Sequence, residues 1–210
     1  GSGAVAADAS TIFFNPAGMT YLQDNQLVMA AHAIRSSAEF NNNGSHSSGG
    51  LPTLGGGGGD AGGWAFAPNI YFAKALNNNV RLGVGINVPF AYKTDYDKEW
   101  VGRYQALKTD IKTININPSI AFKASEKVSL GLGFSAMHMD AEITNAVDFG
   151  TICATGLGGC GIGATFQKND GFARVTGDDW SFGWNAGTIF QITNATRLSL
   201  AYRSAVHQKL

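Results

Sequence analysis

The sequence predicts an all-β fold: an antiparallel transmembrane β-barrel with a short, partly helical plug at its N-terminus. Composition is the first reason, because charged residues make up only 14% of the 210 residues, against about 25% in typical soluble domains. Second, the chain has no run of about 18 apolar residues, which excludes a transmembrane helix. Third, apolar side chains alternate with small polar ones, as in strands that separate lipid from a barrel lumen.

Seven strands are expected, and the alternation delimits them. It is clearest in 180–192, where Trp180, Phe182 and Trp184 alternate with Ser, Gly and Asn. Successive side chains of a strand point to opposite faces, so one face is aromatic and apolar while the other is small and polar. The first strand shows the weakest pattern. The expected strands are 26–40, 64–76, 80–92, 111–123, 127–143, 179–192 and 196–208.

The expected connections are alternately short and long. Short polar turns are expected at 77–79, 124–127 and 193–196, and long loops at 41–63, 91–112 and 144–179. Outer-membrane barrels have this arrangement, with tight periplasmic turns and longer extracellular loops. Seven strands with two open edges cannot span a membrane, because edge amides would lack partners in hydrocarbon. We therefore expect 26–210 to be the first seven strands of a larger barrel, incomplete at its C-terminus.

Residues 1–25 lie outside the strand pattern. Asn15 is a favourable helix cap, and Pro16 suits the first helical position because its missing amide hydrogen would have had no partner. A short helix is expected over 17–22. The adjoining apolar residues, which need a place out of water, are Ile12, Phe13, Phe14 and Met19.

Three stretches of the chain carry a family resemblance. "ADASTIFFNPAGMT", "WAFAPNIYFAKAL" and "DDWSFGWNAGTIFQITNATRLSLAYRSAV" closely resemble, in this order, the FadL family of outer-membrane long-chain fatty acid and hydrocarbon transporters. The resemblance implies a fourteen-stranded barrel whose N-terminal segment, with its Asn15-Pro16-Ala17 motif, plugs the lumen as a hatch. Residues 1–25 would then be the hatch, and its apolar residues would contact ligand or the inward-facing side chains of the barrel.

The expected function is passive uptake of hydrophobic small molecules across the bacterial outer membrane, by a monomer in contact with outer-membrane lipids and lipopolysaccharide. The sequence has no nucleotide motif, redox centre or catalytic constellation, so we expect no enzyme activity and no cofactor. Fifteen basic and fifteen acidic residues cancel, which argues against nucleic acid as a partner. Two alternatives remain: a general polar porin, which would need an open lumen and charged constriction rings, and a structural or adhesive barrel without a ligand.

The sequence leaves the substrate open. A fatty acid needs a cation for its carboxylate, and the lumen-side candidates are Arg81, Arg197 and Arg203, with Arg103 and Lys108 in a loop. Asp140 and Glu142 stand where basic residues would be expected if a carboxylate were bound at the outer end of the fifth strand. Neutral alkanes and aromatic compounds therefore remain alternatives.

Two prolines predict a route out of the lumen. With Asn78 at the centre of a turn, residue 68 faces residue 88, so Pro68 and Pro89 remove two ladder donors at nearly the same height. A β-bulge without function is one interpretation. The other is a kink that parts the second and third strands sideways, which the family resemblance supports. The residues expected at this lateral opening are Pro68, Asn87, Val88, Pro89 and Phe90.

The remaining motifs suggest local structure. Cys153 and Cys160 lie in an expected external loop, and an oxidising periplasm favours a disulfide between them over two free thiols. They lack the further ligands of a zinc site, and the four histidines are scattered, so no metal is expected. The glycine run 55–59 is expected to be a flexible loop tip. Residues 95–100, "DYDKEW", are expected to be an ordinary solvated loop rather than a site for a divalent cation or lipopolysaccharide.

Overall fold

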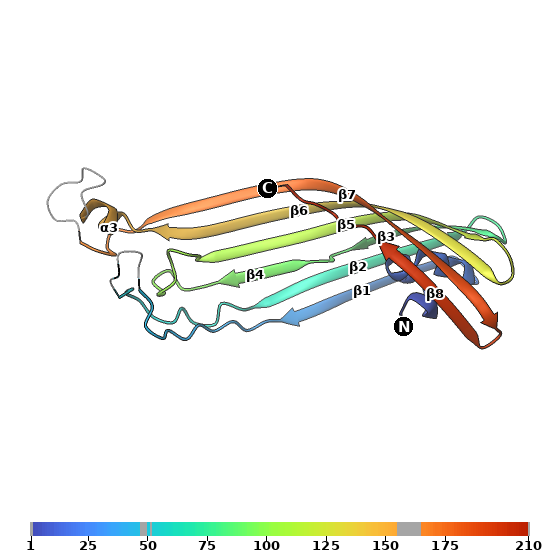
Figure 1. Cartoon of the computed structure of the whole chain (residues 1–210), viewed down its shortest axis with the longest axis horizontal. Helices are drawn as coiled ribbons and strands as arrows, with labels where there is room; N and C mark the ends of the chain where they lie inside the picture. Colours follow the sequence, from blue (N-terminus) through green and yellow to red (C-terminus); the bar gives the residue numbers. More distant parts are fainter. Residues whose placement is uncertain (1, 47–49, 51, 155–164, 210) are drawn as a thin grey trace.

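In the computed structural model, which describes residues 2–46, 50, 52–154 and 165–209, one curved antiparallel sheet forms most of the molecule (Figure 1). The strands are β1 (Gln26–Arg35), β2 (Trp64–Ala75), β3 (Val80–Asn87), β4 (Ala91–Asp95), β5 (Lys108–Lys123), β6 (Val128–Val147), β7 (Gly171–Thr193) and β8 (Thr196–Arg203). Their spatial order is β1-β2-β3-β5-β6-β7-β8, and β4 continues the line of β3 beside β5. The predicted antiparallel β architecture is confirmed, with the third strand broken in two.

The helices are short and lie at two places. Three come before the sheet: α1 (Ser2–Val5), α2 (Thr11–Phe14) and the 3₁₀ helix η1 (Pro16–Tyr21). The fourth, α3 (Phe149–Ala154), follows β6. Among the described residues, no helix is both long enough and apolar enough to cross a membrane.

The two faces of the sheet have opposite chemistry. We call the face against which η1 packs the inner face, and the opposite one the outer face. On β5 the inner face carries buried polar residues, Thr113, Asn115, Asn117 and Ser119, whereas the outer face carries exposed apolar ones, Ile114, Ile116, Ile120 and Phe122. A wall that exposes its apolar side chains and buries its polar ones is built for lipid outside and a polar interior.

The strands run farther toward the long loops than the alternation predicted. Short turns at 76–79, 124–127 and 194–195 join the strands at one end, and long connections join them at the other, as expected. However, β6 and β7 stay paired as far as Val147 and Gly171, so the predicted loop 144–179 is wrong in extent. The apolar alternation stops near residue 138 because charged side chains replace apolar ones on the outer face, while the backbone ladder continues. The first and last strands are shorter than predicted, ending at Arg35 and Arg203.

The glycine run 55–59 packs against the loop that follows β4 and is not a free loop tip. Val101 donates its amide hydrogen to the carbonyl of Gly56 over 2.8 Å. Gly58 has φ of +83°, and a Cβ there would lie 2.8 Å from Cβ of Trp100. Glycine is therefore needed at this position both for the backbone conformation and for close approach to the indole. The result is a second small core at the loop end, around Trp100, Val101 and Leu107.

Candidate functional site

The N-terminal segment, residues 2–22, is seated against the inner face at the turn end of the sheet (Figure 1). Asn15 both starts η1 and ties it to the wall. Its side-chain oxygen accepts a hydrogen bond from the amide of Ala17 over 3.0 Å, and its Nδ2 donates to the carbonyl of Thr188 in β7 over 3.2 Å. Pro16 occupies the first helical position, as the sequence predicted.

Glycines on the inner face make room for this segment. A Cβ at Gly131 of β6 would lie 2.2 Å from the backbone nitrogen of Ala17. A Cβ at Gly83 of β3 would lie 2.5 Å from Sδ of Met19 and 2.6 Å from Cδ1 of Ile12. These positions therefore need glycine because a larger side chain has no space. Some of the small residues that suggested a lumen thus form the surface on which the N-terminal segment packs.

The four apolar residues predicted to form a ligand pocket divide into two pairs. Ile12 and Met19 are fully buried, in a core with the wall residue Tyr71. Phe13 is partly buried, and Phe14 is 48% exposed. Their rings meet edge to face, with centroids 5.3 Å apart. Phe13 and Phe14 are thus the two of the four whose rings remain accessible on the inner side.

The three predicted carboxylate partners all contact the N-terminal segment. Arg203 donates from Nη2 to the carbonyl of Phe13 over 2.6 Å, and its guanidinium lies 4.5 Å from the centroid of the Phe13 ring. Arg197 lies 4.1 Å from the ring centroid of Tyr21. Arg81 donates to the carbonyls of Leu22, over 3.4 Å, and of Asn77. In this arrangement the three arginines hold the N-terminal segment against the wall, and their role toward a carboxylate stays a prediction.

The third strand is interrupted where the sequence places Pro89. Asn87 pairs with Asn115, but Ala91 pairs with Lys112, so three residues of one strand face two of β5. This is the geometry of a β-bulge. Thr113 of β5 bridges the break: Phe90 donates its amide hydrogen to Oγ1 of Thr113 over 3.0 Å, and that hydroxyl donates to the Phe90 carbonyl over 2.6 Å.

The break leaves one edge of β2 without a partner. Pairing between β2 and β3 ends at Ile70 and Ile86, in the register that the sequence predicted. Among the described residues no ladder pair joins 64–69 to 87–92, although β2 stays paired with β1 as far as Trp64. The segments that extend β2 and β3 meet again at the loop end, where the backbone amide of Asp95 donates to the carbonyl of Ala61 over 2.9 Å. Pro68 and Pro89 therefore lie along an unpaired stretch of wall.

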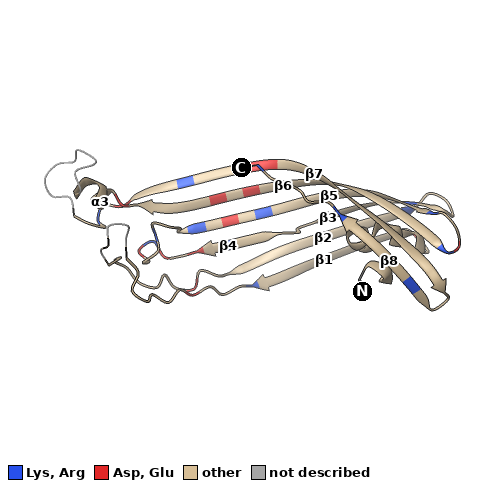
Figure 2. Cartoon of the chain, in the orientation of Figure 1, with Lys and Arg blue, Asp and Glu red and all other residues tan. Residues whose placement is uncertain are grey.

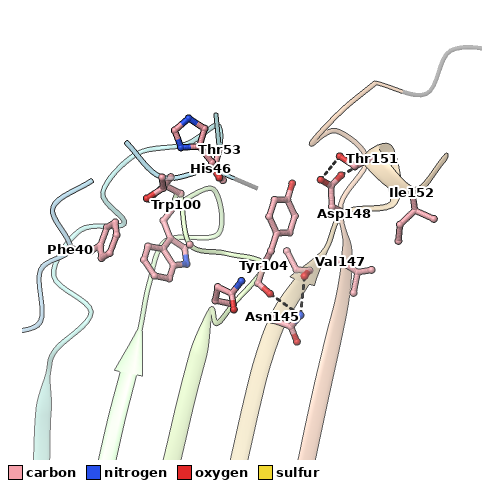
Figure 3. Close-up of a pocket in the computed structure, with 15 residues that line it drawn as sticks. Phe40, His46, Thr53, Trp100, Tyr104, Asn145, Val147, Asp148, Thr151 and Ile152 are labelled. Atoms are coloured by element: carbon pink, nitrogen blue, oxygen red, sulfur yellow. Dashed lines mark hydrogen bonds between the residues drawn. The ribbon is translucent and has the colours of Figure 1, made fainter. Parts of the chain in front are cut away.

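A cavity of about 770 Å³ opens among the long loops (Figure 3). Phe40 and Trp100 line one side, and Tyr104 and Ile152 line the other, with Asn145 at its floor (Figure 3). No Lys or Arg is among these lining residues. No pattern in the sequence predicts this cavity, because its walls come from segments far apart in the chain.

Arg103 connects the loops beside the cavity through hydrogen bonds. It is buried, and its Nε donates to Asp170 over 2.6 Å. Its other nitrogens donate to the phenol oxygen of Tyr104 over 2.6 Å and to the carbonyl of Leu54. Burial raises the pKa of the Tyr104 phenol above its usual value, and the hydrogen bond to Asp170 adds to this effect. Three loops thus meet at one arginine.

The predicted disulfide joins one residue inside the described part of the chain to one outside it. Cys153 lies in α3, but Cys160 falls outside the described residues. Within the described part of the chain, no group of three or more His, Cys, Asp and Glu side chains gathers as a metal site would require.

The chain is similar to proteins of a known outer-membrane family. The family model for outer membrane protein transport proteins (OMPP1/FadL/TodX) matches residues 1–210. Outer membrane protein P1 of Haemophilus influenzae is 32% identical, over 98% of this chain and 50% of that protein. The long-chain fatty acid transport protein of Escherichia coli is 29% identical, over 98% of this chain and 48% of that protein. The chain therefore spans about half the length of these relatives.

A solved structure has the same fold. The Pseudomonas aeruginosa FadL homologue superimposes with a TM-score of 0.83 at 24% identity, over 95% of this chain and 48% of that one. At 24% identity the structural similarity establishes the fold alone. The sheet described above is accordingly about half of a barrel wall of that type.

Proposed function

This chain belongs to the OMPP1/FadL/TodX family of outer membrane transport proteins, and on that premise we propose that it takes up hydrophobic small molecules passively through the outer membrane. Membership of this family places the protein in the bacterial outer membrane and supports the uptake of hydrophobic substrates. In this proposal residues 1–25 act as a hatch in the barrel formed in part by 26–210. The substrates are long-chain fatty acids or neutral hydrocarbons.

The observation that carries the proposal is the combination of a filled interior and an unpaired wall. Ile12 and Met19 are packed against the wall, so the lumen at the turn end is occupied. At the same time, β2 lacks a ladder partner on its β3 side along 64–69, and apolar residues border this stretch on both sides: Phe66, Ile70, Ile86 and Phe90 are all exposed. A hydrophobic solute that leaves sideways stays out of water and keeps the free energy of its apolar burial.

The loop-end cavity supplies an entry point in this scheme. Its aromatic walls, Phe40, Trp100 and Tyr104, offer apolar area at about 25 cal/mol per Å² removed from water. From there a solute would reach the accessible rings of Phe13 and Phe14. Arg203 lies beside them and would donate to a fatty acid carboxylate if its bond to the Phe13 carbonyl opened.

Uptake by the native protein in an outer membrane tests the proposal. Cells that lack other routes should accumulate labelled oleate or a labelled alkane when they express the protein, and should gain no permeability to a small sugar. Replacing Phe13 and Phe14 by Ala should lower hydrophobic uptake, since each substitution removes aromatic contact area. Phe190→Ala, a change on the outer face, is the matched control. Sugar permeability without hydrophobic uptake would instead identify a polar porin.

A further inference from the structure

The outer face carries a belt of charge beyond its apolar region. Figure 2 shows charged residues gathered on β5, β6 and β7 toward the long loops, while the middle of each strand has none. The ladder registers arrange them in rows, because cross-strand partners share a face: Lys112, Asp140 and Asp178 form one row, and Asp110 and Glu142 the next. We call these residues, with Lys108 and Arg174 one row farther, the charged belt: Lys108, Asp110, Lys112, Asp140, Glu142, Arg174 and Asp178.

The belt begins where the lipid-facing region ends. On β5 the outer-face residues from Phe122 to Ile114 are all uncharged, a length of about 27 Å along the strand at about 3.4 Å per residue. This is close to the height of about 25 Å typical of the apolar band of outer-membrane barrels. The next outer-face residue after Ile114 is Lys112. The belt therefore stands at the level of the headgroups of the outer leaflet.

Aromatic side chains occupy the rows of the apolar region that adjoin the belt. Trp180 pairs with His138 in the row next to Lys112, and their ring centroids are 4.9 Å apart. Phe182 lies one row farther into the membrane and Phe134 two rows, and their rings stack with centroids 5.6 Å apart. Aromatic residues prefer the boundary between hydrocarbon and headgroups, which agrees with the height that the strand length gives for the belt.

The belt holds its cations in place on the rigid sheet. Glu142 accepts from Nζ of Lys108 over 3.2 Å and from Nη2 of Arg174 over 2.8 Å. Asp110 forms an ion pair with Lys112, with 3.2 Å between Oδ1 and Nζ. The side chains of Lys112 and Arg174 nevertheless remain 63% and 58% exposed, so most of their donors face outward. Cations held in this way lose little further side-chain freedom when they bind a phosphate.

We propose that the charged belt is a docking surface for lipopolysaccharide, with Lys112 and Arg174 donating to the phosphates of its headgroup. The belt mixes three cations with four carboxylates, which is unsuited to a free anion. The belt does suit a lipid layer in which phosphates alternate with the divalent cations that bridge them. In such a layer the phosphates face the cations of the belt, and the divalent cations face its carboxylates. The occupant is thus an anionic glycolipid of the outer leaflet, and this assignment does not depend on the transported substrate.

Native mass spectrometry of the purified native protein, with defined bisphosphorylated lipid A, tests the docking surface. Lys112→Gln combined with Arg174→Gln should weaken lipid A binding about 25-fold, because a cation near an anionic surface contributes about fivefold each. The matched control, Lys74→Gln with Lys127→Gln, removes the same charge at the turn end and should bind like the unaltered protein. If the double variant fails to fold, Arg174→Gln alone, beyond the apolar region, should lose about fivefold.

Two further lipids test whether the phosphates of lipid A are the groups that are recognised. Dephosphorylated lipid A should bind the unaltered protein as weakly as phosphorylated lipid A binds the double variant. Phosphatidylglycerol should bind less tightly than phosphorylated lipid A and should respond little to the two substitutions. Equal lipid A affinity in the double variant and the unaltered protein would overturn the proposal. So would equal affinity for lipid A with and without phosphate, or for phosphatidylglycerol and lipid A.

Discussion

Gly131 lies directly against the backbone of the N-terminal segment. Alanine there would place Cβ 2.2 Å from the nitrogen of Ala17, so either the strand or the segment must move. We predict that Gly131→Ala destabilises docking of the segment by about 1–3 kcal/mol, the usual effect of overpacking. Hydrogen exchange over 11–22 should become faster. Gly63→Ala, where a Cβ meets nothing within 4 Å, is the control and should leave exchange unchanged.

Arg203 fastens the same segment through charge. Its bond to the Phe13 carbonyl and its contact with the Phe13 ring join β8 to α2. We predict that Arg203→Gln speeds hydrogen exchange over 11–15 about tenfold or more, since a hydrogen bond to a charged group is typically worth about 1.5–3 kcal/mol. Arg35→Gln, at the loop end of β1, should not change this exchange. Unaltered exchange in Arg203→Gln would show that the arginine does not hold the segment.

Single residues were predictable from sequence where the cause is local. Asn15 caps η1 because its side chain reaches an amide two residues away, and this can be inferred from Asn-Pro alone. The contacts of Arg81, Arg197 and Arg203 with the N-terminal segment were not predictable, because that segment lies more than 50 residues away in the chain. Alternation placed these arginines on the inner face but could not say what they contact there.

At the scale of the strands, turn chemistry set the register. The turn around Asn78 predicted that residues whose numbers sum to 156 face each other, and Ile70 indeed pairs with Ile86. The one-residue shift beside β5 was not predictable, since it depends on how Thr113 bonds to Phe90. The length of β6 and β7 was missed for another reason. Beyond the lipid, the outer face no longer needs apolar residues, so the pattern that delimits a strand disappears while its ladder continues.

The unpaired edge of β2 should be detectable without mutation. Amides of 64–69 that point away from β1 have no ladder acceptor, whereas residues 70–73 have partners on both sides. We predict faster hydrogen exchange in 64–69 than in 70–73, because an amide without a ladder bond is protected only by its surroundings. Residue-resolved exchange of the protein in detergent measures this difference. Uniformly slow exchange across β2 would mean that the wall is closed there.

For the whole molecule, the arrangement is inverted relative to a soluble protein. Apolar residues cover the outer face, and the interior is lined by asparagines and serines that bond to one another, such as Asn117 to Asn185 over 2.9 Å. The N-terminal segment packs at the turn end, and loops joined by Arg103 surround a cavity at the other end. In the proposed route a hydrophobic solute enters through this cavity, and because the N-terminal segment occupies the turn end, it leaves through the stretch between β2 and β3.

A reversible disulfide across that stretch tests the lateral exit most directly. Continuing the register of Ile70 and Ile86 places Asn69 opposite Asn87, so Asn69→Cys with Asn87→Cys should join the two strands when oxidised. A control pair, Lys74→Cys with Leu82→Cys, links positions that are already paired. We predict that oxidation lowers uptake of a labelled hydrophobic solute at least about tenfold in the first variant only, and that a reductant restores it. Full uptake by the oxidised first variant, with its disulfide verified by mass, would contradict the lateral route.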